Sequence, residues 1–411
     1  MRYRLDTQIV LSGVPEGPFA KHLRAYAAFL RVQGYEAHYL HRHVMLAARF
    51  SQWLERRRLT AWRVDSKYVT RYLRCRHRQR QASRGDVPSL RHFMAYLRGR
   101  RAIPPEKTAT LPIVPAEACA RDYEQYLRQD RALCRATIIN YVPFVRDFLK
   151  DRFGDGAVHL SCLRAKDVIT FVQGRARRLH VKRAKLMTTA LRSFFRYARM
   201  RGEITLDLAA AVPIVANWSM TSIPRAIAAE QTQRLLASID RKSSMGRRDY
   251  AILLVLARLG LRAGEVMSLE LDDIDWSTGA LTVRGKGRRS QLPLAPDVGK
   301  AIAAYLRHGR PECASRRVFL RTKAPIGGFH GASGVGSMVR HRLELARINS
   351  PTFGTHQFRH GLASDMLRQG ASLAEIGAVL GHQHPDTTRI YTKIDLKSLH
   401  ALAQRWPGGV P

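Results

Sequence analysis

A tyrosine near the C-terminus follows a histidine at a spacing that could serve nucleophilic chemistry. In the segment LGHQHPDTTRIYTK, His382 precedes Tyr391 by nine residues, and Pro385 and Asp386 break the chain between them. A tyrosine hydroxyl becomes a nucleophile when neighbouring cations favour the loss of its proton. Taken alone, the segment favours an aromatic side chain that simply packs near a chain end, so both interpretations stay open here.

Basic and proton-carrying side chains gather in a second segment, GTHQFRHGLASDML. His356 and Arg359 stand three residues apart, hence on one face of a helix, and His360 follows directly. Such groups on one face are poorly explained as part of an apolar core. We therefore expect this helix to present them to a site.

Two more basic residues stand beside glycines. Arg262 lies between Gly260 and Gly264 at the expected end of an apolar helix, where a guanidinium can point into a cleft. Lys286 lies in the turn RGKGRRS of an expected β-hairpin, where glycines let the backbone approach a phosphate closely. Taken alone, each is more typical of an exposed turn.

Helix signals indicate how the C-terminal residues are positioned. Ser372 and Glu375 form a capping box before an apolar run, and Gly381 is the expected end of that helix, which leaves His382 at its exit. Asp386 is expected to cap the next helix, which carries the tyrosine. The sharp turn between them allows the histidine and the tyrosine to face one site.

These residues match the signature of a known family, in order and with suitable intervals. The residues that carry the match are Arg262, Lys286, His356, Arg359, His382 and Tyr391. About residues 222 to 400 thus resemble the catalytic domain of the tyrosine recombinases, also called phage-type integrases. Residues 115–208 resemble the family's core-binding domain in position and helix pattern, whereas residues 1 to about 105 lie outside the usual two-domain plan.

The resemblance implies strand transfer at a DNA phosphodiester, with Tyr391 as nucleophile and a covalent 3′-phosphotyrosyl intermediate. Because the phosphate gains negative charge in the transition state, two arginines that grip its non-bridging oxygens suit the reaction, and these roles fall to Arg262 and Arg359. The family pattern makes His356 the base that accepts the tyrosine proton.

The remaining matched residues complete the expected site. His382 would bond to a phosphate oxygen, and Lys286 would protonate the leaving 5′ oxygen as a general acid. Glu265 is expected to orient Arg262, and His360 is a supporting candidate. The reaction stores the ester energy in the phosphotyrosine, so neither a metal ion nor another cofactor is expected.

The charge of the chain agrees with a polyanionic partner. The 411 residues carry 70 Lys and Arg against 32 Asp and Glu, a formal net charge of +38. Such an excess, spread along the chain, is most commonly balanced by nucleic acid, here double-stranded DNA. The five cysteines lack zinc-finger spacing, and no segment has the length and apolarity of a membrane span. We therefore expect a cytoplasmic, bacterial protein that acts on DNA without membrane attachment.

The patterns predict a mostly α fold with a small antiparallel sheet in the catalytic domain, arranged as a DNA clamp. The expected parts are an extra helical domain at 1–108, a core-binding domain at 115–210, a linker at 211–224 and the catalytic domain at 225–411. LRHFMAYLRGRRAI aligns with LRSFFRYARMRGEI, so the first domain is either a duplicate of the second or only a similar Arg-rich helical sequence. We further expect the helix at 182–201 to face DNA.

The predicted function is site-specific recombination or integration for a mobile genetic element, as in transposition. The family implies a homotetramer, or a mixed assembly with related recombinases, on two DNA sites. A relaxing topoisomerase would share the chemistry without joining two sites, and an accessory DNA-binding protein would keep the fold without catalysis. The intact set of six residues argues against the accessory protein.

Overall fold

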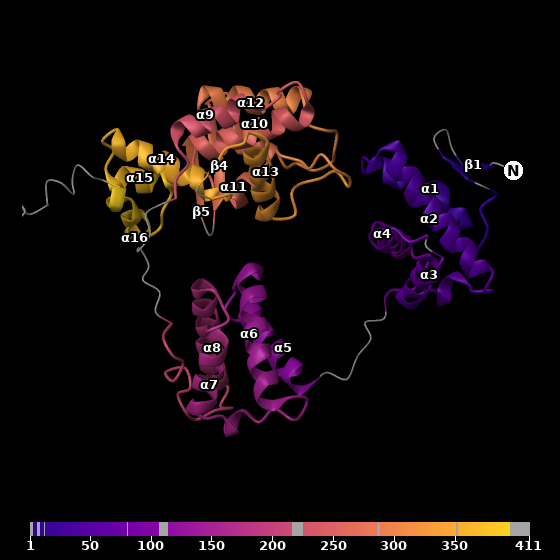
Figure 1. Cartoon of the computed structure of the whole chain (residues 1–411), viewed down its shortest axis with the longest axis horizontal. Helices are drawn as coiled ribbons and strands as arrows, with labels where there is room; N and C mark the ends of the chain where they lie inside the picture. The colour runs from indigo at the N-terminus through magenta and orange to yellow at the C-terminus, as the bar shows by residue number, and fades with distance from the viewer. Residues whose placement is uncertain are drawn as a thin grey trace, which may run out of the picture. The chain divides into compact units, whose positions relative to one another are not determined.

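The computed structural model describes residues 3–5, 9–11, 13–79, 81–106, 114–215, 225–285, 288–350 and 352–394. These residues are mostly helical, with one two-stranded and one three-stranded antiparallel sheet (Figure 1). The predicted fold class is confirmed. The short pair β1 (Tyr3–Arg4) and β2 (Val10–Leu11) was not expected, because two-residue strands carry no alternation of apolar and polar residues.

The N-terminal part contains four helices around its own core: α1 (Leu23–Val32), α2 (Ala37–Glu55), α3 (Ser66–Arg78) and α4 (Asp86–Gly99). The apolar residues of α2 recur every three or four positions, so one face of that helix is buried. Asp65 caps α3 by accepting a hydrogen bond of 2.8 Å from the backbone of Lys67.

The middle part also contains four helices around a separate core: α5 (Pro115–Gln129), α6 (Arg135–Phe153), α7 (Ala165–Ala176) and α8 (Val181–Met200). The helix predicted to face DNA is therefore present as α8. Its apolar face contributes Phe194 and Phe195 to the core, and Arg196 and Arg199 are exposed. The linker expected at 211–224 falls largely on 216–224, which lies outside the described residues.

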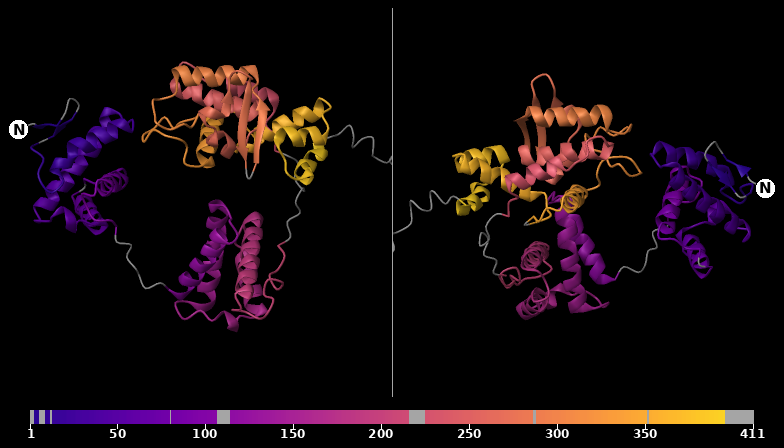
Figure 2. Two further views of the ribbon diagram at one scale, coloured as in Figure 1. Left: turned by 180° about the vertical axis from the view of Figure 1, so that it is seen from behind. Right: turned by 45° about the horizontal axis from the view of Figure 1, so that its top comes forward.

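The C-terminal part packs helices against a three-stranded sheet of order β3-β4-β5. The strands are β3 (Ile274–Asp275), β4 (Ala280–Gly285) and β5 (Arg288–Pro293), and Figure 2 shows β4 and β5 running side by side. Leu281 pairs with Leu292, and Val283 pairs with Ser290. The predicted hairpin is confirmed, and the last described pair of its two strands is Gly285 with Arg288.

The helices of this part form a main core and a small second one near the C-terminus. The main core contains α9 (Ala229–Ala237), α10 (Ser244–Arg258), α11 (Ala263–Ser268), α12 (Pro296–His308) and α13 (Ala332–Leu345). The second core joins α14 (His356–Arg368), α15 (Leu373–Leu380), α16 (Pro385–Thr388) and the 3-10 helix η5 (Arg389–Ile394), at the yellow end of the chain in Figure 1.

The predicted signals around α15 are confirmed except for one. The capping box of Ser372 and Glu375 is present, and Gly381 ends α15 with a positive φ of 63°. The cap predicted at Asp386 is wrong, since α16 begins after His384 with Pro385 at its first position. Proline suits that position because it needs no backbone N–H, and Asp386 instead pairs with Arg389 at 3.1 Å.

Candidate active site

Arg262 lies at a tight turn between α10 and α11. Gly260 adopts a positive φ of 59°, and an added Cβ there would come within 2.8 Å of the Leu380 side chain, so only glycine fits. Arg262 caps α11, and Glu265 accepts hydrogen bonds of 2.8 Å from both its backbone N–H and its guanidinium. Glu265 thus orients Arg262 in the structure.

The buried side chain of Arg359 connects two backbone segments of the site. Its guanidinium is almost fully buried and donates hydrogen bonds to the backbone oxygens of Gly260, at 2.7 Å, and Leu380. These bonds join the turn before Arg262 to the end of α15. A buried guanidinium between backbone carbonyls keeps its charge in a fixed place.

One hollow of about 390 Å³ is lined by three of the six residues that carry the family match. Arg262, His356 and His382 all line it. The other lining residues are Glu265, Gly285, Gly381, Gln383, His384 and Thr387. Lys286 lies outside the described residues, but its neighbour Gly285 forms part of the wall.

The electrostatics of the hollow favour a neutral His356. Burial lowers the pKa of this histidine from its ordinary value, and the positive charges of Arg359 and Arg262 lower it further. The carboxylate of Glu265 acts in the opposite direction. A neutral imidazole beside two guanidinium groups can accept a proton or a hydrogen bond.

His382 is held by a residue that the sequence did not single out. Its Nδ1 and the hydroxyl of Thr388 share a hydrogen bond of 2.7 Å, and its backbone N–H donates to the oxygen of Gly377 at 2.9 Å. Thr388 is buried beneath the turn. A threonine six residues after the histidine gives no recognisable signal, because only the short helix α16 brings the two together.

Tyr391 lies in the small C-terminal core and does not line the hollow. Its side chain is 1% exposed and packs with Ala363, Ile376 and Leu380. Its hydroxyl and Nδ1 of His360 share a hydrogen bond of 3.0 Å. Burial raises the pKa of Tyr391 to about 12, and the charge of Arg359 opposes this rise. In this conformation the phenol stays protonated.

The histidine that bonds to the tyrosine hydroxyl is His360, which the sequence indicated only as a supporting residue. Burial lowers the pKa of His360, as do the charges of His356 and Arg359. The rings of His360 and Tyr391 lie 5.7 Å apart at an angle of 61°. The two groups form a neutral, hydrogen-bonded pair near the charge of Arg359.

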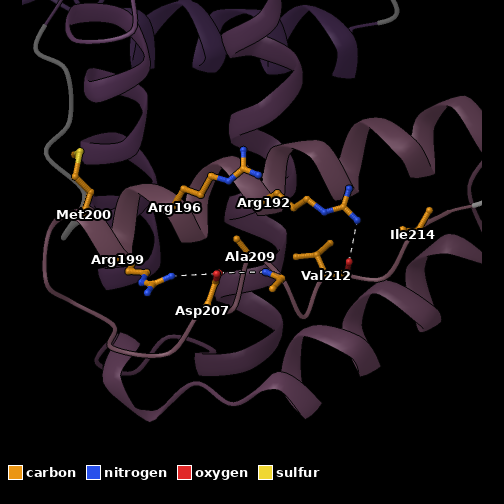
Figure 3. A pocket seen from close by; sticks show the side chains of 9 residues that line it. Arg192, Arg196, Arg199, Met200, Asp207, Ala209, Val212 and Ile214 are labelled. Carbon is orange, nitrogen blue, oxygen red and sulfur yellow. Dashed lines mark hydrogen bonds and ion pairs between the residues drawn. The ribbon is translucent and has the colours of Figure 1, made fainter.

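A second hollow, in the middle part of the chain, is lined by three arginines of α8 (Figure 3). Arg192 donates hydrogen bonds to the backbone oxygens of Val212 and Pro213, at 2.9 and 3.2 Å. Arg199 pairs with Asp207 at 3.0 Å. Arg196 is exposed on the same helix. Two of the three arginines are thus engaged within the protein.

Comparisons with known proteins decide the family. The sequence profile of the phage integrase family matches residues 225–397, and that of the phage integrase N-terminal SAM-like domain matches residues 120–202. The protein y4rA of Sinorhizobium fredii, which carries an integrase/recombinase name, is 54% identical over 408 residues, 99% of each chain. The chain belongs to the phage integrase, or tyrosine recombinase, family. The predicted resemblance is confirmed, and the family's reaction is the cleavage and rejoining of DNA strands.

More distant tyrosine recombinases are also similar to this chain. The tyrosine recombinase XerD of Listeria monocytogenes is 27% identical, over 68% of this chain and 96% of that one. The crystal structure of XerH bound to its difH substrate after cleavage has a TM-score of 0.55 at 19% identity, over 70% of this chain and 84% of that one. The integrase of transposon Tn1549 with circular intermediate DNA has a TM-score of 0.53 at 16% identity, over 70% and 99%. These two structures support the fold.

In the described part of the chain, every helix is too short or too polar to span a bilayer.

Proposed function

We propose that this tyrosine recombinase performs site-specific recombination of double-stranded DNA for a mobile genetic element, such as its integration or transposition. The observation that carries the proposal is the hollow that brings Arg262, His356 and His382 together, with Arg359 fixed behind it. This arrangement places two guanidinium groups and two histidines at or beside one hollow, near Tyr391. The strand would be cut and rejoined through a 3′-phosphotyrosyl intermediate.

Arg262 and His382, which line the hollow, are proposed to contact the scissile phosphate, and Arg359 is proposed to add its fixed positive charge from its buried position behind them. The transition state carries more negative charge than the phosphodiester, so fixed cations stabilise it preferentially. Glu265 already holds the Arg262 guanidinium at 2.8 Å, which reduces the reorganisation needed on binding. Hydrogen bonding to Thr388 fixes the ring of His382 against the same pocket.

The reaction then requires Tyr391 to leave its buried position. Its hydroxyl bonds to His360 at 3.0 Å in the structure, and a pKa of about 12 keeps it unreactive. We propose that DNA binding moves Tyr391 toward the hollow, where His356 accepts its proton. The tyrosine oxygen bonds to phosphorus, the bond from phosphorus to the 5′ oxygen breaks, and Lys286 protonates that oxygen.

The wider assembly follows the same proposal. Residues 115–210 and 225–411 would close around the duplex as a clamp, joined by a linker at 211–224, with α8 facing DNA. Residues 1–108 would form an additional helical domain. Four protomers, identical or from related recombinases, would join two DNA sites. A cytoplasmic location, where DNA is accessible, fits this role.

The decisive experiment is the capture of a covalent intermediate. The protein is incubated with nicked suicide duplexes that carry the ends of its own element, and adducts are resolved on a denaturing gel. Loss of the short strand beyond the nick prevents rejoining, so an active enzyme accumulates as an adduct. Absence of any adduct from the wild-type protein on all such duplexes rules out the proposal.

The pH dependence of cleavage tests the role of His356. The base must be neutral, and the pKa of His356 lies below its ordinary value of 6.5, so the single-turnover rate is expected to fall only below about pH 6.5. His356→Ala is expected to lower the rate about 10²-fold or more and to remove this acid limb. An acid limb that persists unchanged in His356→Ala assigns the base to another group.

Removing His360 is expected to affect stability more than chemistry. His360→Ala leaves the buried hydroxyl of Tyr391 without its partner, which costs about 1–3 kcal/mol of unfolding free energy. The single-turnover cleavage rate should stay within about tenfold of wild type, because His360 contacts the tyrosine only in its resting position. Denaturant unfolding and the adduct assay measure the two effects. A loss of rate as large as that of His356→Ala makes His360 the base.

A further inference from the structure

The N-terminal helices lie outside both matching family profiles, which cover 120–202 and 225–397. Helices α1–α4 nevertheless repeat the order of α5–α8. The second helix has 19 residues in both sets, and a one-turn 3-10 helix precedes the third, at Ala61–Arg63 and at Leu160–Cys162. The two helix sets thus have the same order of helices and the same short 3-10 helix before the third.

The buried positions also coincide. Six of the seven buried positions of α2 recur in α6 at a constant interval of 98 residues (138 − 40): Leu40, Val44, Leu46, Ala47, Phe50 and Ser51 correspond to Ile138, Val142, Phe144, Val145, Phe148 and Leu149. The seventh, Leu54, corresponds to the exposed Arg152. Buried positions of α4 likewise recur in α8 at an interval of 101 (191 − 90): Ser89, Leu90, Phe93, Met94, Tyr96 and Leu97 correspond to Ala190, Leu191, Phe194, Phe195, Tyr197 and Ala198. Amphipathic helices that merely resemble each other would not keep this register.

The aromatic contacts between helices recur as well. Tyr26 of α1 lies 4.8 Å from Phe93 and 5.1 Å from Tyr96, measured between ring centroids. At the corresponding positions, Tyr123 of α5 lies 5.4 Å from Phe194 and 5.5 Å from Tyr197. Phe50 and Tyr72 lie 5.2 Å apart, as do Phe148 and Phe171. The two cores are therefore packed alike.

The surfaces of the two helix sets differ at the third helix. Lys67, Arg71, Arg74 and Arg78 are all exposed on α3 at spacings of four, three and four residues, which places them on one face. The corresponding exposed residues of α7 and its C-cap, 99 positions later, are Lys166, Thr170, Gln173 and Arg177. We name the four residues of α3 the basic stripe. The N-terminal set has gained two charges at its centre.

The basic stripe lacks acidic neighbours on its own helix. Ser66–Arg78 contains five Lys and Arg and no Asp or Glu. Among the described residues, no ion pair within 4.0 Å involves a member of the stripe. Residues 1–106 contain 22 Lys and Arg against 7 Asp and Glu, a net charge of +15, whereas residues 107–221 contain 20 against 10, or +10. The N-terminal part is thus the more basic of the two.

We propose that α1–α4 is a second copy of the SAM-like domain and binds duplex DNA beside the cleaved site through the basic stripe. This rests on the proposed function, because DNA is the partner in both. The stripe spans about 16 Å along α3, from a rise of about 1.5 Å per residue, which corresponds to roughly five base pairs of duplex. Four exposed cations over that length suit the phosphates of one strand.

The test compares two charge-matched variants of the full chain. One replaces the basic stripe (Lys67→Gln, Arg71→Gln, Arg74→Gln, Arg78→Gln), and the control replaces four exposed basic residues of other elements in the same part (Lys21→Gln, Arg49→Gln, Arg91→Gln, Arg100→Gln). Binding is measured by fluorescence anisotropy between 50 and 200 mM salt. The probes are a 60-base-pair duplex that contains an element end and a 20-base-pair duplex trimmed to the cleavage site.

The stripe variant is expected to bind the long duplex at least tenfold more weakly than wild type, and its slope of log K against log salt should be shallower by about 3 to 4. Binding to the short duplex and adduct yield should match wild type, and the control variant should show smaller changes. Thermal unfolding confirms that both variants fold.

Equal binding of the long duplex by the stripe and control variants overturns the inference alone. All eight substituted residues are exposed, so both variants should fold. A double variant, Arg71→Gln with Arg74→Gln, removes two of the four charges and should give about half of the change in slope. If wild-type protein binds neither duplex and forms no adduct, the proposed function itself fails, and the inference fails with it.

Discussion

Tyr391→Phe is expected to abolish the covalent protein–DNA adduct. Phenylalanine fills the same buried space but lacks the oxygen that bonds to phosphorus. Loss of the hydrogen bond to His360 costs about 1 kcal/mol of unfolding free energy, so the variant should remain folded. Affinity for the suicide duplex should be unchanged. The denaturing gel measures the adduct, and anisotropy measures the binding.

A matched control comes from another buried tyrosine of the same part of the chain. The hydroxyl of Tyr305 accepts a hydrogen bond of 3.2 Å from the backbone N–H of Leu320, and its side chain is fully buried. Tyr305→Phe therefore loses a comparable bond at a comparable depth, and it should keep the wild-type adduct yield. An adduct that persists in Tyr391→Phe assigns the nucleophile to another residue.

The sequence predicted which residues lie near Arg262, but it did not predict that Tyr391 is buried. For Arg262, His356 and His382, the match to the family's residue order was enough to expect one site, and these three residues from different elements line one hollow. The burial of Tyr391 depends on Ala363 and Ile376, which belong to other helices. No local pattern contains that packing. The structure shows Tyr391 packed as an aromatic in its resting position, and its role as nucleophile stays a proposal.

In the fold, too, features with short-range signals were predicted and long-range contacts were missed. The hairpin of β4 and β5 and the capping box of α15 follow from short-range signals, and both were predicted. The bond from His382 to Thr388 was missed because it depends on how α16 turns back toward the end of α15. The pairing of Arg359 with the backbone of Gly260 was missed for the same reason, since 99 residues separate the partners.

Arg262→Ala is expected to lower the single-turnover cleavage rate about 10²- to 10³-fold. The loss reflects one fixed cation at the phosphate, whose charge is highest in the transition state. Arg262→Lys should recover only part of the rate, because a lysine keeps the charge but not the planar pair of donors. DNA affinity should change much less than the rate, since Arg262 is one of 70 Lys and Arg residues available to attract the duplex. Quenched-flow sampling on the suicide duplex measures the rate.

Arg258 provides the matched control for Arg262. It lies four residues earlier, at the end of α10, and pairs with Asp297 at 3.1 Å in an exposed ion pair. It does not line the hollow that holds Arg262. Arg258→Ala removes the same charge from the same region, so a purely long-range electrostatic role would slow both variants equally. A wild-type rate in Arg258→Ala beside a hundredfold loss in Arg262→Ala places the effect at the phosphate, whereas equal losses would refute a direct contact.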